Sequence, residues 1–172
     1  RSQLLTQFDR MIKAAESTQK VIMVFFITLD NFKKINDAMG HHAGDKLLKM
    51  LSTRFFEVLQ QGDIAGRWGG DEFVLLSEHL SSESLVIDMA QRLLEIIRQR
   101  FEIDDLEVFV SASIGISFYP ENGFTSEVVV KMAGTAMYRI KEDGGNQYGL
   151  YSPELSAAWT REQITLEKEL RT

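Results

Sequence analysis

Apolar residues along this chain follow two patterns, helical spacing and short continuous runs. Helical spacing predicts amphipathic helices, whereas short β-rich runs predict buried strands. The expected helices lie near residues 4–12, 31–37, 45–60, 83–97, 128–141 and 161–171. The expected strands lie at 21–27, on both sides of Gly69-Gly70, at 108–119 and at 148–151.

Glycines divide the segment from residue 31 to residue 60 into two helices. We expect the stretch from Gly40 to Gly44 to break the first helix, so that the second begins at Asp45. Apolar residues from Leu47 to Leu59 then form one face of the second helix.

The order of these elements is α, β, α, α, β, β, α, β, α, β, followed by the terminal helix. A mixed order that contains one hairpin favours an α+β fold, with a mostly antiparallel sheet covered by helices, over a parallel doubly wound sheet. The 172 residues, 44% of them hydrophobic, suffice for one domain with a proper core.

Composition narrows the classes of partner. Lys and Arg number 19 against 25 Asp and Glu, a net charge of −6, so we expect no nucleic-acid partner. The absence of Cys excludes disulfides and thiolate metal sites and fits a reducing cytoplasm. The apolar run at 21–27 is too short to cross a bilayer. We expect a cytoplasmic domain cut from a longer parent protein, which could itself be anchored in a membrane.

The most informative residues are Asp71 and Glu72, which follow Gly69-Gly70 at an expected hairpin tip. The glycines let a ligand approach the backbone closely, and the carboxylates can hold a hard cation, which suits a nucleoside triphosphate with magnesium. Asp30 ends the first strand, and its carboxylate would converge with the other two if the strands are neighbours. Either feature alone is more often a helix cap or an ordinary tight turn.

Five motifs in order strengthen the functional interpretation. They occupy residues 29–37, 40–41 with 44–45, 67–73, 113–116, and 136–138 with 141. On these motifs the chain resembles the GGDEF domain family, the diguanylate cyclases, over nearly its whole length. The resemblance implies a ferredoxin-like palm with a five-stranded sheet. It also implies condensation of two GTP molecules, held by two facing domains of a homodimer, to cyclic diguanylate and two pyrophosphates.

The resemblance assigns the base-reading residues. Asn36 and Asp45 would read guanine, with Phe32 in the same substrate site. A carboxylate accepts from the ring N–H and the exocyclic amine together, and an amide covers the remaining edge, whereas adenine would leave Asp45 without donors. A helix terminator at Asn36 and a helix N-terminal charge at Asp45 are the plain structural alternatives.

The resemblance also assigns the phosphate and metal residues. Gly69-Gly70 would cradle phosphates and Lys141 would contact them, although a solvated last-turn lysine is the alternative. Asp71 and the backbone carbonyl of Leu29 would bind Mg²⁺ or Mn²⁺, and Glu72 would assist at the metal and at the attacking hydroxyl.

Three positions depart from the family pattern. Thr28 stands where active members carry a metal-binding Asp, Gly145 replaces a phosphate-binding Arg, and Gln60 replaces the Arg of the product-inhibition site that Asp63 would complete. Loss of the carboxylate should weaken metal binding by at least roughly 10- to 100-fold. Asp30 shares a strand face with position 28 and would compensate in part if the strand shifted.

We therefore expect a degenerate GGDEF domain at 1–152 that binds GTP as a regulator or retains slow synthesis. The alternatives are an active cyclase, a non-catalytic dimerisation or docking module, and an ATP-using palm transferase, which Asp45 disfavours. The segment 153–172 is similar to the connector that precedes EAL phosphodiesterase domains, which predicts a hybrid parent protein. A plain amphipathic end helix explains that segment equally well.

Overall fold

The computed structural model describes residues 1–79 and 83–153, so the expected connector helix lies, from residue 154 on, outside the described residues. Within these ranges, no helix is long and apolar enough to cross a bilayer. The helices are α1 (Ser2–Thr18), α2 (Phe32–Met39), α3 (His41–Val58), α4 (Glu83–Arg98) and α5 (Ser126–Glu142). The strands are β1 (Val21–Leu29), β2 (Ile64–Gly69), β3 (Glu72–His79), β4 (Phe101–Ile103), β5 (Leu106–Val108), β6 (Ala112–Tyr119) and β7 (Gln147–Leu150).

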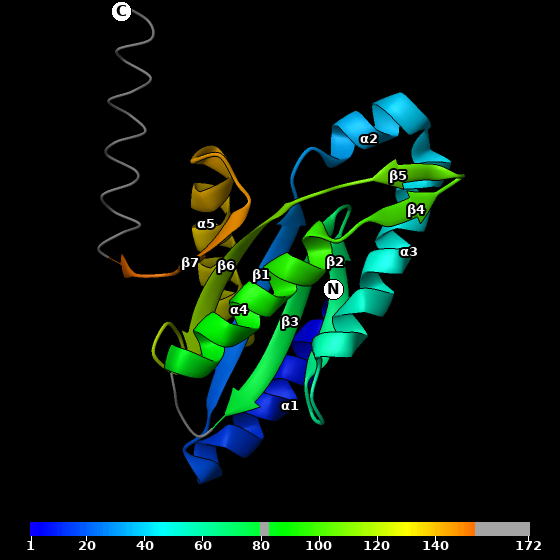
Figure 1. Ribbon diagram of the computed structural model, residues 1–172. Coiled ribbons are helices and arrows are strands. Elements are labelled where there is room, and N and C mark those ends of the chain that lie inside the picture. Colours follow the sequence, from blue (N-terminus) through cyan, green and yellow to red (C-terminus); the bar gives the residue numbers. More distant parts are fainter. Residues whose placement is uncertain (80–82, 154–172) are drawn as a thin grey trace, which may run out of the picture.

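One five-stranded sheet of order β2-β3-β1-β6-β7 forms the centre of the domain (Figure 1). β1 is antiparallel to both β3 and β6, β2 is antiparallel to β3, and β6 and β7 form a parallel pair. The predicted α+β class, with a mostly antiparallel sheet of five strands, is confirmed.

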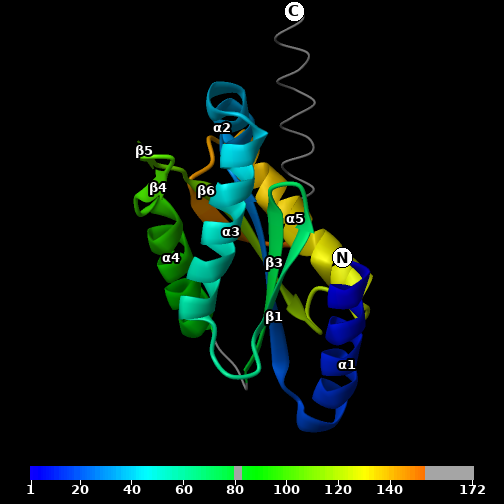
Figure 2. The same cartoon turned by 90° about the vertical axis from the view of Figure 1, so that its right-hand side faces the viewer.

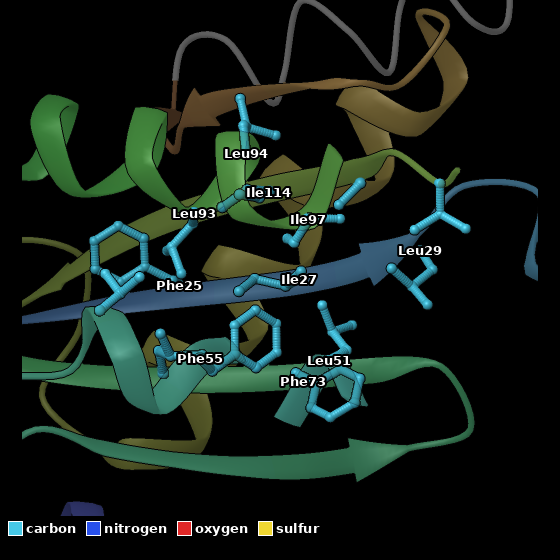
Figure 3. Packing of buried hydrophobic residues seen from close by; sticks show 14 of the residues in the cluster. Phe25, Ile27, Leu29, Leu51, Phe55, Phe73, Leu93, Leu94, Ile97 and Ile114 are labelled. Atoms are coloured by element: carbon cyan, nitrogen blue, oxygen red, sulfur yellow. The ribbon is translucent and has the colours of Figure 1, made fainter. Parts of the chain in front are cut away.

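Helices cover both faces of the sheet, with α3 and α4 on one side and α1 and α5 on the other (Figure 2). β1 is buried on both faces, which explains its continuous apolar run. Phe25 and Ile27 enter the cluster beneath α3 and α4, where Phe55 packs edge-to-face on Phe73 (Figure 3). Phe26 enters the opposite cluster, and all four of these phenylalanines are buried.

The predicted start of the second helix at Asp45 is wrong. α3 begins at His41, and Gly40 alone separates it from α2, with a φ of 92° that few other residues tolerate. Gly44 continues the helix, and its amide N–H donates to the Gly40 carbonyl at 3.3 Å. Its missing side chain serves packing between α2 and α3 and does not end a helix.

The single strand predicted at 108–119 is also wrong. β5 ends at Val108 and β6 begins at Ala112, while β4 and β5 form a separate two-stranded hairpin. Asp104 and Asp105 both have positive φ, 52° and 67°, as a tight two-residue hairpin turn requires. Two adjacent aspartates between short apolar-polar alternations were the sequence signal for this hairpin.

Gly115 lets α5 lie directly on β6. A Cβ atom at this residue would lie 2.0 Å from the carbonyl oxygen of Ala133 and 2.2 Å from the amide nitrogen of Met137. This close contact fixes α5 against the sheet and thereby sets where the C-terminal half of the helix lies.

Candidate functional site

The end of β1 and the β2–β3 hairpin lie side by side. The predicted convergence of the Asp30 carboxylate with Asp71 and Glu72 is nevertheless wrong, because Asp30 bonds to Ser111, Ser113 and Asn146 instead. Thr28 is the register partner of Glu72, and its Oγ1 donates to Oδ2 of Asp71 at 3.4 Å. The amide of Leu29 donates to the backbone carbonyl of Asp71, also at 3.4 Å. Thr28 is only 1% exposed, so a buried neutral hydroxyl faces the half-buried Asp71.

The hairpin tip presents open backbone. Gly70 has a φ of 43°, and its carbonyl accepts from Nε of Arg67 at 2.8 Å. A Cβ atom would meet nothing within 4 Å at Gly69 or at Gly70, so a ligand can lie against this backbone. Trp68 faces the α1–α5 side, where its ring packs edge-to-face on Phe26.

Tyr138 of α5 lies beside Asp71 and Glu72, which we call the acidic group, although no role for Tyr138 followed from the sequence. Its hydroxyl donates to Oε2 of Glu72 at 3.3 Å. Burial raises the pKa of Tyr138, and the charge and hydrogen bond of Glu72 and the charge of Asp71 raise it further. The hydroxyl therefore stays protonated and remains a donor to Glu72. Its position one helical turn before Lys141 was the available signal.

The base-reading candidates meet where α2 and α3 adjoin. A Cβ atom on Gly44 would lie 1.9 Å from Oδ1 of Asn36 and 3.2 Å from Cζ of Phe32, so glycine is what lets these side chains pack there. Oδ1 of Asn36 is buried and has no hydrogen-bond partner. Asp45 is exposed and lines a pocket of about 310 Å³ together with Arg67 of the hairpin.

The phosphate-binding candidates lie at the end of α5. Lys141 is exposed in the last turn of the helix. Gly145 has a φ of 72°, and a Cβ atom there would lie 2.6 Å from Oδ1 of Asp30. An arginine at residue 145 therefore requires either this turn or Asp30 to move.

Asp30 is 9% exposed and accepts hydrogen bonds from several groups outside the hairpin. Its donors are Oγ of Ser111 at 2.6 Å, Oγ of Ser113 at 2.7 Å and the backbone amide of Asn146 at 2.9 Å. Serines within an otherwise apolar strand were the sequence signal for this arrangement.

The product-inhibition candidates lie at the far end of β3 from Glu72. Asp63 accepts from the backbone amide of Gln60 and from Oγ of Ser77, both at 2.9 Å. Nε2 of His79 lies 2.6 Å from the same serine hydroxyl. Both oxygens of Asp63 are thus engaged within the domain, and Gln60 supplies no cation beside them.

The acidic group contains two carboxylates. Among the described residues, no cluster of three or more His, Cys, Asp or Glu side chains could hold a metal ion by itself. His41 and His42 are both exposed on α3, and they belong to no such cluster. A cation at Asp71 and Glu72 would need further ligands from backbone, water or a bound phosphate.

Comparison with known proteins places this geometry in a family. The sequence profile described as "Diguanylate cyclase, GGDEF domain" matches residues 1–147. The chain is 38% identical to the cyclic di-GMP phosphodiesterase PdeR of Escherichia coli (strain K12) over 163 residues, which are 95% of this chain and 24% of PdeR. It is 37% identical over 165 residues to the bifunctional diguanylate cyclase/cyclic di-GMP phosphodiesterase MucR of Pseudomonas aeruginosa, 96% of this chain and 24% of MucR.

Solved structures agree with the sequence comparison. The crystal structure of the GGDEF domain of YfiN (TpbB) from Pseudomonas aeruginosa superposes with a TM-score of 0.85 at 31% identity, covering 88% of this chain and 95% of that domain. The chain spans about a quarter of the length of PdeR and of MucR, so it corresponds to one part of each. This chain belongs to the GGDEF domain family of cyclic di-GMP signalling.

Proposed function

We propose that this domain binds GTP with Mg²⁺ or Mn²⁺ and acts mainly as a nucleotide-responsive regulator, with weak or lost diguanylate cyclase activity. Membership of the GGDEF family supports the ligand class. The residues of the base and phosphate regions support GTP binding, whereas those of the metal region indicate that cyclase turnover is weak or lost.

The base region supports guanine recognition. A buried acceptor without a donor destabilises a protein by about 1–3 kcal/mol, and Oδ1 of Asn36 is such an acceptor. Rotation of this amide toward a bound guanine would give the oxygen an exocyclic amine as its donor. Asp45 is exposed nearby and would accept from the ring N–H. Adenine offers no equivalent pair of donors, so GTP is favoured over ATP.

The phosphate region supports binding of the triphosphate. The backbone of Gly69-Gly70 is free of side chains that would keep a phosphate away. Lys141 is exposed at the end of α5, from which its four-carbon side chain can reach an anion.

The acidic residues fit one magnesium ion that arrives with the triphosphate. Mg²⁺ is commonly held by one or two carboxylates together with substrate phosphates and water, and Asp71 and Glu72 supply that number. The carbonyl of Leu29 is the further protein ligand that we expect. When bound, the ion would neutralise charge on the phosphates, while Asp71 and Glu72 hold it beside the glycine backbone.

The observation that carries the proposal is the contact between Thr28 and Asp71. A hydroxyl at 3.4 Å from this carboxylate supplies no negative charge where the family has a third acid. Loss of one electrostatic stabiliser of a transition state is worth about 2–4 kcal/mol, and Gly145 represents a second loss. If the two losses add, turnover falls by about 10³- to 10⁶-fold, whereas ground-state binding of the base is untouched.

The relatives suggest the setting in which the domain acts. PdeR and NbdA are named as cyclic di-GMP phosphodiesterases, and a structure from M. capsulatus with 36% identity is described as an EAL/GGDEF domain protein. We infer that the parent protein carries an EAL domain whose activity responds to GTP held here. Any residual synthesis would need a second copy facing the first. A GTP-responsive role agrees with a cytoplasmic position.

Calorimetry and product analysis on the same preparation test this proposal. We expect binding of GTP with Mg²⁺, no comparable binding of ATP, loss of GTP binding in Asp45→Asn, and little cyclic diguanylate. Rapid formation of cyclic diguanylate would show an active cyclase. An absence of GTP binding with and without metal would favour a docking module instead.

A further inference from the structure

Both oxygens of the buried Asp30 carboxylate are occupied by donors from distant parts of the chain. Oδ1 accepts from Ser113, and Oδ2 accepts from Ser111 and from the backbone amide of Asn146. The backbone amide of Asp30 donates to the carbonyl of Ser111 at 2.9 Å. Asp30 thus joins the end of β1 to the start of β6 and to the turn between α5 and β7.

The turn held by Asp30 is the one that ends α5. Gly144, Gly145 and Asn146 have φ values of 113°, 72° and 57°. Positive φ is incompatible with a right-handed helix, so α5 cannot continue through these three residues. The amide of Gly144 donates to the carbonyl of Lys141 at 3.3 Å, and that of Gly145 donates to Ile140 at 2.9 Å. The position of Lys141 is therefore coupled to the position of this turn.

Arg98, at the end of α4, holds the other side of Asn146. Its Nε donates to Oδ1 of Asn146 at 2.7 Å, and its Nη2 donates to the Asn146 carbonyl at 3.0 Å. Asn146 is consequently fixed through its amide by Asp30 and through both of its oxygens by Arg98. We call Asp30, Arg98 and Asn146 the turn clasp.

We propose that Asp30 is a positioning residue for the bound triphosphate, and that it acts through the turn clasp and not as a metal ligand. Asp30 directly follows Leu29, whose carbonyl is the expected metal ligand. The same carboxylate anchors the turn that follows Lys141. One side chain therefore sets the distance between the metal end and the lysine end of the phosphate region.

Competition between the two roles argues against metal ligation by Asp30. A metal ion that took either carboxylate oxygen would leave buried donors unpaired, namely the hydroxyl of Ser113 or those of Ser111 and the Asn146 amide. Ser113 itself is fully buried, so bulk solvent does not reach its hydroxyl to replace the lost acceptor. The carboxylate oxygens are already paired with directed hydrogen bonds, as buried polar groups usually are.

A ligand-free experiment tests the anchoring role. In Asp30→Asn, amide hydrogen exchange at Gly145 and Asn146 should accelerate about tenfold, as expected for loss of a charged acceptor, while Ala133 in the middle of α5 is unchanged. Gly145→Ala, which places a methyl group against the carboxylate, should give the same result without altering Asp30. Asp105→Asn, at the exposed β4–β5 turn, is the matched control. Unchanged exchange in both test variants would overturn the proposal.

A nucleotide experiment tests the positioning role, which rests on the proposed function. Asp30→Asn should weaken binding of GTP with Mg²⁺ about tenfold and leave guanosine binding within about twofold, because only the phosphate region moves. Lys141→Ala should lose a similar amount, and the double variant should be no weaker than Lys141→Ala alone. Additive losses would mean that Asp30 acts independently, as a metal ligand would, and would overturn the proposal.

The two experiments separate the present inference from the proposed function. If the wild-type domain binds no GTP while Asp30→Asn still loses protection of the turn, then the proposed function fails and the anchoring role of Asp30 stands. If the wild-type domain binds GTP and the turn is unaffected by Asp30→Asn, the opposite conclusion follows.

Discussion

Replacing Thr28 by Asp should make the stability of this domain depend on magnesium. Thr28 is 1% exposed, and its hydroxyl lies 3.4 Å from Asp71. Two carboxylates at that separation repel each other by about 5 kcal/mol at an effective dielectric constant of about 20. For a domain of this size, each 1 kcal/mol lowers the melting temperature by about 2–4 °C, so metal-free Thr28→Asp should melt about 10–20 °C below the wild type.

Magnesium should reverse much of that loss. An ion bound between the two acids replaces their repulsion by attraction, and a concentration of about 100 times the Kd adds roughly 2.7 kcal/mol of stability. Restoration of the carboxylate should also strengthen Mg²⁺ binding by about 10- to 100-fold and raise synthesis of cyclic diguanylate. Thermal unfolding with EDTA and with a Mg²⁺ series measures the first effect, and calorimetry and product analysis measure the others.

Thr28→Asn is the matched control, because it has the shape of Asp without its charge. Its melting temperature should be independent of Mg²⁺. If Thr28→Asp and Thr28→Asn show the same melting temperatures with and without the metal, residue 28 does not face a cation site and the electrostatic explanation is wrong.

Three further outcomes are expected. Gly44→Ala should weaken GTP binding about tenfold or more, because its methyl group displaces Asn36. The melting temperature should change little, since alanine favours a helix interior. Unchanged GTP affinity would count against Asn36 as a base reader. Gly115→Ala should lower the free energy of unfolding in urea by about 3 kcal/mol, because its Cβ would lie 2.0 Å from the Ala133 carbonyl, and a near-neutral effect would show that α5 shifts freely. In a pH titration followed by tyrosine absorbance, one tyrosine should ionise above the usual pKa and be missing in Tyr138→Phe. Because the pKa of Tyr138 is raised in the folded state, its contribution to stability is present below the ordinary tyrosine pKa and is lost as the pH rises through the folded value.

Local pattern predicted most of the elements but not their boundaries. The alternation of helical spacing and apolar runs gave the central strands, because β1 is apolar on both faces and helices must cover it. The β4–β5 hairpin was missed since three-residue strands are too short for a clear period. The helix start at His41 was missed because Gly44 looked like a break, although its role is to admit Asn36.

The sequence alone determined the family and the chemistry that this domain can offer. The five motifs place two acids after a glycine pair, and Thr28 and Gly145 already show the missing charges. The residue type at each position decides whether a charged side chain is present, so the family and the missing charges follow from the sequence without the tertiary structure.

Only the tertiary structure decided which groups meet. Tyr138 reaches Glu72 across 66 positions of the chain, and Asp30 reaches Asn146 across 116. Contacts over such separations depend on strand register and on the packing of α5 against β6, which local periodicity does not encode. The structure therefore determined that the carboxylate of Asp30 holds a turn, while Thr28 lies against Asp71 within hydrogen-bond distance.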